Sequence, residues 1–243
     1  MERISLAILA SGGGTTAEAI IKSRVVDVVL VICNNADAGV VEKAKRLDVP
    51  VEIMPRAPFK VFKNGEEDVM ASRLKYGEAL LDKLSRYNVT HISQNGWMIL
   101  TPPNVVKEFT GRIVNQHPGP LDPGYPDFGG QGMYGLRVHA AVLNFVRGVK
   151  RPFSTAATIH QVNEIYDKGD LVATSKVKIM GEDSPEELAA RVLPVEHRLQ
   201  IDFWKDAALG IVTCNRTSRL ILPEEYSILE RAKKLAIEQY PKG

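Results

Sequence analysis

The stretch ISLAILASGGGTTAEAII, residues 4–21, decides the fold of this chain. Residues 4–10 are nearly all apolar, which is expected of a strand buried in a parallel sheet. Three consecutive glycines follow, and from Ala17 onward the apolar residues take up helical spacing. A buried strand, a glycine turn and a helix in this order predict an α/β fold that begins at the N-terminus.

The glycine turn predicts a phosphate site. Glycines let backbone N–H groups approach an anion closely, and the N-terminus of the following helix is partly positive. Hydroxyl groups after the glycines can add further donors. The residues that would surround the anion are Gly12, Gly13, Gly14, Thr15 and Thr16. A tight turn between strand and helix that binds nothing is the alternative interpretation.

The spacing Gly12-x-Gly14-x-x-Ala17 also fits a loose dinucleotide fingerprint. That fingerprint requires an acidic residue at the end of the second strand, where this chain has Asn34-Asn35. A Gly-Lys-Ser/Thr sequence is also missing, which excludes a Walker loop. The turn therefore favours a simple phosphomonoester over a dinucleotide or a nucleoside triphosphate.

Further strands and helices alternate along the chain. Strands are expected at residues 25–33, 51–54, 89–93, 112–117, 154–162, 171–179 and 211–214. Helices are expected at residues 38–47, 66–86, after an N-cap threonine at 101, at 137–149, at 184–208 and from about 223. This order predicts a Rossmann-like, doubly wound, mostly parallel sheet in a single domain that spans residues 1–243.

Composition narrows the class of protein. The chain has 44% hydrophobic and 25% charged residues and a net charge of +2, so bulk charge predicts neither nucleic-acid nor membrane binding. Cys33 and Cys214 are far apart and lack CxxC partners, so we expect neither a disulfide framework nor a metal site. The N-terminus shows no signal-peptide pattern, and no apolar run reaches transmembrane length. A cytoplasmic protein is expected.

The stretch RIVNQHPG, residues 112–119, predicts the catalytic centre. Asn115 and His117 stand two residues apart at the end of a strand, so their side chains point to the same face. Open α/β sheets bind their ligands where strands end. An amide can donate to a developing oxyanion, and an imidazole moves protons near neutral pH. Two polar residues that only solvate a turn are the alternative.

An unusual connection follows at residues 118–136. Residues 118–135 contain six glycines and four prolines and show no apolar periodicity. Loops of this length inside a compact domain are uncommon and are often functional. Because this one begins beside His117, we interpret it as an active-site loop that covers the centre.

Several motifs, taken in order, resemble the glycinamide ribonucleotide formyltransferases, a purine-pathway branch of the folate-dependent formyltransferase family. The likeness spans nearly the whole chain. It rests on Ser11-Gly12-Gly13-Gly14-Thr15-Thr16, Gly96-Trp97-Met98, Asn115-x-His117-Pro118, Tyr166-Asp167-Lys168-Gly169 and Glu196-His197. The N-terminal glycine loop distinguishes this branch from the methionyl-tRNA and amino-sugar formyltransferases, which resemble the chain mainly around Asn115, His117 and Asp167.

The resemblance implies transfer of a formyl group from 10-formyltetrahydrofolate, as co-substrate, to the amine of glycinamide ribonucleotide, with no metal. Asn115, His117 and Asp167 would be catalytic: Asn115 and protonated His117 would stabilise the oxyanion, and Asp167 would pair with His117 and relay the amine's proton through water. The glycine loop would bind the substrate phosphate, and Glu196 would contact its ribose. The residues that would lie near the folate are Arg73, Gly96, Trp97, Met98, Val162 and Tyr166.

Each of these roles has a plainer alternative. Asp167 before glycine is common in turns, and Glu196 and Arg73 could be solvated helix charges. His160 aligns with a strand histidine of the family but could be a satisfied core residue. The chain also departs from the family pattern: Ile99 follows Met98 where an arginine is usual, and the loop at residues 118–136 is longer and richer in glycine.

Other functions remain open at this point. The alternatives are a formyltetrahydrofolate hydrolase, a formyltransferase for another phosphorylated amine, a phosphate-binding module without catalysis, and a nicotinamide-dependent reductase. Small-molecule substrates are the expected partners, with neither nucleic acid nor membrane, and a homodimer is left open.

Overall fold

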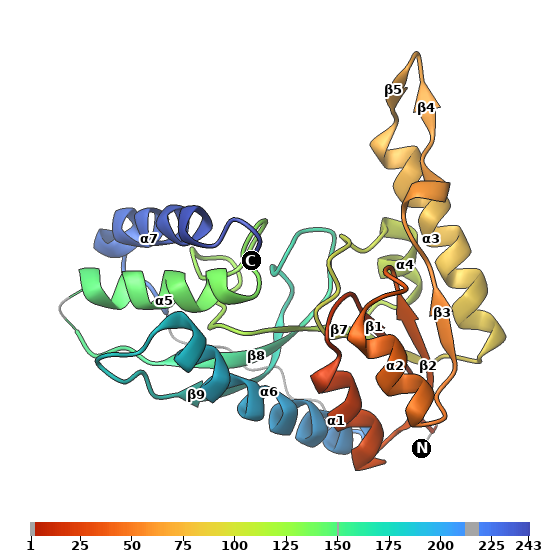
Figure 1. The fold of residues 1–243 in the computed structure, drawn as a ribbon, viewed down its shortest axis with the longest axis horizontal. Coiled ribbons are helices and arrows are strands. Elements are labelled where there is room, and N and C mark those ends of the chain that lie inside the picture. Colours follow the sequence, from red (N-terminus) through yellow and green to blue (C-terminus); the bar gives the residue numbers. More distant parts are fainter. Residues whose placement is uncertain (1–2, 150, 212–218) are drawn as a thin grey trace. The chain divides into compact units, whose positions relative to one another are not determined.

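The alternating strands and helices form one seven-stranded sheet with flanking helices in a computed structural model, which describes residues 3–149, 151–211 and 219–243 (Figure 1). The strands lie in the order β3-β2-β1-β6-β7-β8-β9. They are β1 (Ser5–Ala10), β2 (Asp27–Cys33), β3 (Val51–Ile53), β6 (His91–Gln94), β7 (Ile113–His117), β8 (Thr155–Gln161) and β9 (Leu171–Val177). Strands β3, β2, β1, β6 and β7 pair in parallel, whereas β8 and β9 are antiparallel. The predicted mostly parallel, Rossmann-like sheet is confirmed.

The helices follow the predicted alternation. They are α1 (Thr15–Ser23), α2 (Gly39–Arg46), α3 (Val69–Arg86), α4 (Pro103–Glu108), α5 (Leu136–Gly148), α6 (Pro185–Ala208) and α7 (Tyr226–Gln239), with short 3₁₀ turns η1 (Ala57–Phe59) and η2 (Pro223–Glu225). At the start of α6, where the sequence predicts a helix from residue 184, Ser184 and Glu187 form reciprocal capping bonds: Glu187 N donates to Ser184 Oγ and Ser184 N donates to Glu187 Oε2.

Three sequence predictions need correction or fall outside the structure. The long helix begins at Val69 rather than at residue 66, because Asp68 accepts from Ala71 N as its N-cap and a small hairpin, β4 (Phe62–Lys63) and β5 (Glu66–Glu67), precedes it. Thr101 does not cap α4; its hydroxyl accepts a hydrogen bond from Gln94 Nε2 at 2.6 Å, and Pro102 is the N-cap. The strand predicted at 211–214 lies outside the described residues except for Ile211.

The chain divides into two compact units, each with its own core. The first comprises the described residues up to 115 together with 162–164 and 204–211, and the second comprises the rest. In the first unit, α3 buries Tyr76, Leu80 and Leu84, spaced four residues apart, against β1, β2 and β6. This core fixes the carboxyl ends of β1 and β6, where the glycine loop and residues 95–98 begin.

In the second unit, α5 packs beside α7 and covers the antiparallel pair β8–β9 (Figure 1). The loop at residues 118–136 contributes Phe128 and Met133 to this core, and the rings of Phe128 and Phe145 meet edge to face at 5.5 Å. Leu121 of the same loop is also buried. The loop is therefore packed into the unit by its apolar side chains, which the glycine and proline content did not reveal.

No helix in the described part of the chain has the length and apolar character needed to cross a membrane.

The turn between β8 and β9 has no room for a side chain at Gly169. A Cβ built there would lie 1.7 Å from the carbonyl oxygen of Gln161, whereas one built on Gly181 would have nothing within 4 Å. We expect Gly169→Ala to lower the free energy of unfolding by about 2 kcal/mol or more, because backbone must move to relieve the clash. Gly181→Ala should change it by less than about 1 kcal/mol. Urea unfolding midpoints of the two variants check this; equal midpoints would contradict the packing described for this turn.

Candidate active site

His117 ends β7, and its imidazole is buried in the second unit with 3% of its surface exposed. Asn115 stands two positions earlier in the same strand, which places the two side chains on one face of the sheet by strand alternation. The predicted amide and imidazole therefore emerge from one strand end.

Asp167 lies beside His117, as the sequence predicted. Its Oδ2 is 3.6 Å from His117 Nδ1, and its Oδ1 is 3.4 Å from His160 Nε2. Gly130 N also donates to Asp167 Oδ2, at 2.9 Å. The backbone of Asp167 is left-handed, with a φ of 56°, a conformation that Asp tolerates better than most residues. That conformation turns the carboxylate back toward the two histidines.

Electrostatics keep Asp167 ionised. Burial alone would raise the pKa of its carboxyl, but His117, His160 and the N–H of Gly130 together hold that pKa well below its usual value. Asp167 therefore carries a negative charge throughout the physiological pH range. The bland interpretation of Asp167 as only a turn former is wrong, because its carboxylate contacts two buried imidazoles.

Burial lowers the pKa of His117 below its usual 6.5; Asp167 raises it again in part, and His160 lowers it further. The structure thus favours a neutral ring at pH 7 and does not support the expected resting imidazolium. However, His117 Nε2 faces the carbonyl oxygen of Phe128 at 3.2 Å, and Nδ1 faces Asp167. Both oxygens are acceptors, and a neutral imidazole has only one N–H. One of the two ring nitrogens therefore faces an oxygen without forming a hydrogen bond to it. The ring is placed to accept a proton when negative charge develops nearby.

Gln116, the residue between the two predicted catalytic ones, points to the other face of β7. Its Nε2 donates to Glu196 Oε1 at 2.7 Å, and its Oε1 is buried without a partner among the described residues. The pKa of Glu196 is raised to about 7 because burial outweighs the lowering effect of the bond from Gln116. Glu196 is therefore a buried carboxyl and not a solvated helix charge. Sequence reasoning identified Glu196 and missed Gln116.

The glycine loop in the first unit leads from β1 into the N-terminus of α1. Gly14 is the N-cap of α1 with a φ of 70°, and a Cβ there would lie 2.5 Å from the Cβ of Val40, so glycine is required. Val40 N donates to Gly12 O at 3.1 Å and holds the loop against α2. Gly12 and Gly13 are exposed at the N-terminus of α1. Thr15 is exposed as well, whereas Thr16 is buried.

Residues 95–98 form the neighbouring turn, and it is tied to the glycine loop. Ser11 N donates to Gly96 O, and Met98 N donates to Ser11 Oγ, both at 3.0 Å. Within the described residues, neither amide atom of the buried Asn95 side chain, nor the buried indole N–H of Trp97, has a hydrogen-bond partner. Buried polar groups without partners are rare and indicate a ligand or water that meets them. Asn95 was not singled out in the sequence, because it carries no motif.

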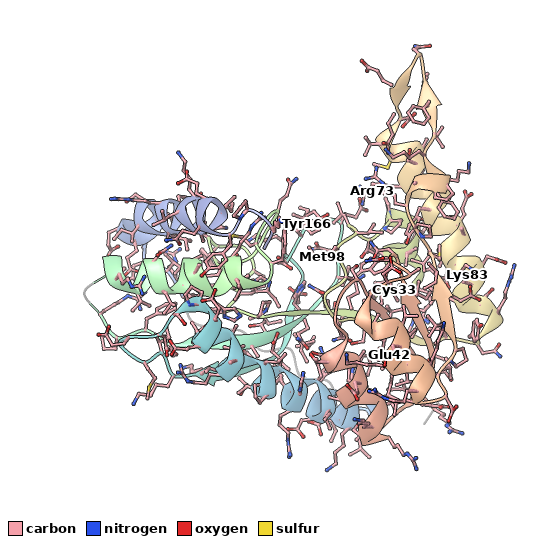
Figure 2. All side chains as sticks on the ribbon, in the orientation of Figure 1. Cys33, Glu42, Arg73, Lys83, Met98 and Tyr166 are labelled. Atoms are coloured by element: carbon pink, nitrogen blue, oxygen red, sulfur yellow. The ribbon has the colours of Figure 1, made fainter. Side chains whose placement is uncertain are left out.

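The other residues predicted to lie near a folate have structural contacts of their own. Arg73, on α3, donates from Nη2 to Thr101 O at 3.0 Å (Figure 2). Val162 donates from its backbone N to Ile113 O at 3.1 Å and packs against the first core. Tyr166, in the second unit, is half-buried. Contact with a folate stays a prediction for all three residues.

No group of three or more His, Cys, Asp and Glu side chains suited to a metal ion occurs within residues 3–149, 151–211 and 219–243.

Comparison with known proteins identifies the family of this chain. A sequence model of the family described as "Formyl transferase" matches residues 4–203. A chloroplastic phosphoribosylglycinamide formyltransferase from Arabidopsis thaliana is 38% identical over 205 residues, which cover 82% of this chain and 64% of that protein. The chain thus spans slightly less than two thirds of that plant relative.

Solved structures resemble the fold as well. Phosphoribosylglycinamide formyltransferase from Bacillus halodurans superposes with a TM-score of 0.67 at 30% identity, covering 84% of this chain and 94% of that chain. Glycinamide ribonucleotide transformylase 1 from Symbiobacterium toebii superposes with a TM-score of 0.70 at 29% identity, covering 86% and 89% of the two chains.

Removing the Asp167 charge should lower the pKa of His117 further, because that charge raises it in the intact protein. We expect Asp167→Asn to lower the pKa of His117 by about one unit or more, as is typical for loss of an opposite charge within 6 Å. An NMR titration of the imidazole proton resonances as a function of pH measures this pKa. Asp170→Asn, at an exposed neighbour, is the matched control and should leave the titration of His117 unchanged.

Glu196 should make stability depend on pH. Because its pKa of about 7 in the folded state exceeds the ordinary 4.5, the folded state binds this proton more tightly than the unfolded state. The resulting stabilisation is complete below pH 4.5 and is lost as pH rises to about 7, with a total loss of about 3 kcal/mol. Glu196→Gln should remove this loss, and Glu182→Gln, at an exposed site, should not. Urea unfolding on both sides of that pH window measures the effect.

Proposed function

Since this chain belongs to the formyl transferase family, we propose that it transfers the formyl group of 10-formyltetrahydrofolate to the amine of glycinamide ribonucleotide, a step of purine biosynthesis. The observation that carries the proposal is the buried pair of His117 and the ionised Asp167, with an acceptor oxygen opposite each imidazole nitrogen. This pair suits a reaction in which a proton must leave an attacking amine while an oxyanion forms.

The chemistry follows from these groups. The amine attacks the formyl carbon, and negative charge develops on the formyl oxygen. Asn115 would donate to that oxygen from its amide, a stabilisation often worth about 3 kcal/mol. The resting neutral His117 would take the amine's proton, directly or through water, because Asp167 and the new oxyanion both favour the imidazolium. The C–N bond to the folate then breaks, and the departing nitrogen receives a proton. The reaction needs no covalent enzyme intermediate.

Substrate binding is supported by three further features. The exposed glycines of the loop at 12–14 and the N-terminus of α1 suit a phosphate group. Gln116 offers a buried acceptor oxygen, and Glu196, whose pKa is about 7, offers a carboxyl proton when the pH is below that value. Both groups suit the hydroxyl groups of a ribose. The unpaired buried groups of Asn95 and Trp97 beside exposed Met98 suit the polar, partly apolar ring system of a folate.

Two aspects of the protein's setting stay predictions. A cytoplasmic location was expected from the sequence, yet the plant relative is named as chloroplastic. A homodimer likewise remains a prediction that the fold of one chain does not address.

The test is release of tetrahydrofolate from 10-formyltetrahydrofolate by the purified protein. We expect release only when glycinamide ribonucleotide is present, and we expect Asn115→Ala and His117→Ala each to reduce turnover by about 10²–10³-fold, as is typical for loss of an oxyanion donor or a general base. Circular dichroism should show that both variants remain folded.

Three outcomes would contradict the proposal in different ways. Release without any amine would identify a hydrolase. Release only with another phosphorylated amine would change the acceptor, and no release with any amine would indicate a binding module. Full activity in either alanine variant would remove that residue from the mechanism.

A further inference from the structure

Residues 127–130 in the loop hold both members of the buried pair through backbone atoms. The carbonyl oxygen of Phe128 faces His117 Nε2 at 3.2 Å, and the N–H of Gly130 donates to Asp167 Oδ2 at 2.9 Å. Gly129 between them is packed tightly: a Cβ there would lie 2.7 Å from the Cβ of Asp167. The position of this turn therefore sets the positions of the imidazole and the carboxylate together.

A lysine from the C-terminal helix binds this turn. Lys233, in α7, donates from Nζ to Asp127 O at 3.2 Å and to Gly129 O at 2.8 Å. These two carbonyls flank Phe128, so the ammonium group fixes the peptide units on both sides of the carbonyl that faces His117. A charged donor makes such bonds stronger than those between neutral groups.

The turn is also held from within, by the side chain of Asp127. This carboxylate is buried, with 1% of its surface exposed, and accepts from Asp122 N, Gly129 N and Lys168 Nζ, each at 3.0 Å. These bonds shape the turn locally. Phe128 packs against Phe145 of α5, and Lys233 binds the backbone of the turn from α7, more than 100 residues away in sequence.

We propose that Lys233 is a positioning residue for the buried pair: by binding the carbonyls of Asp127 and Gly129, it holds residues 127–130 where Phe128 O meets His117 and Gly130 N meets Asp167. Lys233 touches neither the reacting atoms nor His117 itself. Its effect passes through the backbone of the turn. The effect on turnover rests on the proposed formyl transfer, whereas the effect on the titration of His117 does not.

The pKa of His117 can distinguish a shift of the turn from a simple loss of the Lys233 charge. His117 is influenced by Asp167, His160 and Asp127, and it influences His139 in α5. Lys233 is surrounded by Glu230, Asp127, Lys168 and Asp167. Removing a cation near Asp167 acts through charge to raise the pKa of His117, whereas loss of the Phe128 carbonyl contact lowers it. The two mechanisms thus predict opposite shifts.

The experiment compares Lys233→Met, which keeps the length of the stem, with Lys234→Met at the exposed neighbouring position. In Lys233→Met we expect the pKa of His117, measured by NMR, to fall, and kcat to fall about tenfold or more with little change in KM for the amine, because misplacement of a catalytic group affects the chemical step. Lys233→Arg, which keeps the charge and the donors, should restore part of kcat. Lys234→Met should behave as the unmodified protein.

Other outcomes would overturn the inference. A folded Lys233→Met protein with unchanged kcat and an unchanged His117 titration would show that the turn needs no help from α7. A raised pKa of His117 would mean that Lys233 acts only as a charge. A large drop in melting temperature with normal kcat and a normal titration would make Lys233 a stability contact alone. If formyl transfer itself were not observed, the NMR titrations would still test the role of Lys233.

Discussion

Burial of the Asp167 carboxylate is the constraint on which the rest of the site depends. Removing an ionised carboxylate from water costs several kcal/mol even after relaxation, unless hydrogen bonds and opposite charge offset that cost. Here His117 from β7, His160 from β8 and the backbone N–H of Gly130 surround the carboxylate. The strand β7, the antiparallel pair β8–β9 and the loop at 118–136 must all be in place before Asp167 is stable in its position. The position of the Asp167 carboxylate therefore depends on the folded second unit.

The same burial makes His117 responsive rather than permanently charged. An imidazolium in this environment is disfavoured by the loss of water, yet two acceptor oxygens stand opposite its nitrogens. A further negative charge near the ring would raise the pKa of His117, as Asp167 already does in part. An imidazolium carries protons on both nitrogens and cannot accept another, so in the proposed reaction the neutral ring, which the lowered pKa favours, is the form that can take a proton from an amine.

The sequence predicted those parts of the structure that depend on local pattern. The apolar runs identified the seven strands of the sheet, and the motifs identified His117, Asp167 and the glycine loop. What the sequence could not predict depends on backbone groups or on contacts between distant segments. The carbonyl of Phe128 and the N–H of Gly130 carry no side-chain signal, and Lys233 resembles any other lysine of an amphipathic helix. The prediction that the long helix begins at residue 66 was wrong, because Asp68, one of several acidic residues there, is the N-cap.

The register of β7 depends on apolar packing in the first unit. In this strand Ile113 pairs with Ile92 of β6, and Asn115 pairs with Gln94. Ile113 is buried in the first core, so a slip by one residue would move it to the opposite face. The same slip would turn the side chain of His117 to the opposite face of β7, away from Asp167. Apolar packing of Ile113 thus helps to fix the face of β7 on which the His117 imidazole lies. Strand alternation places the side chains of residues 115 and 117 on one face of the sheet and that of residue 116 on the other.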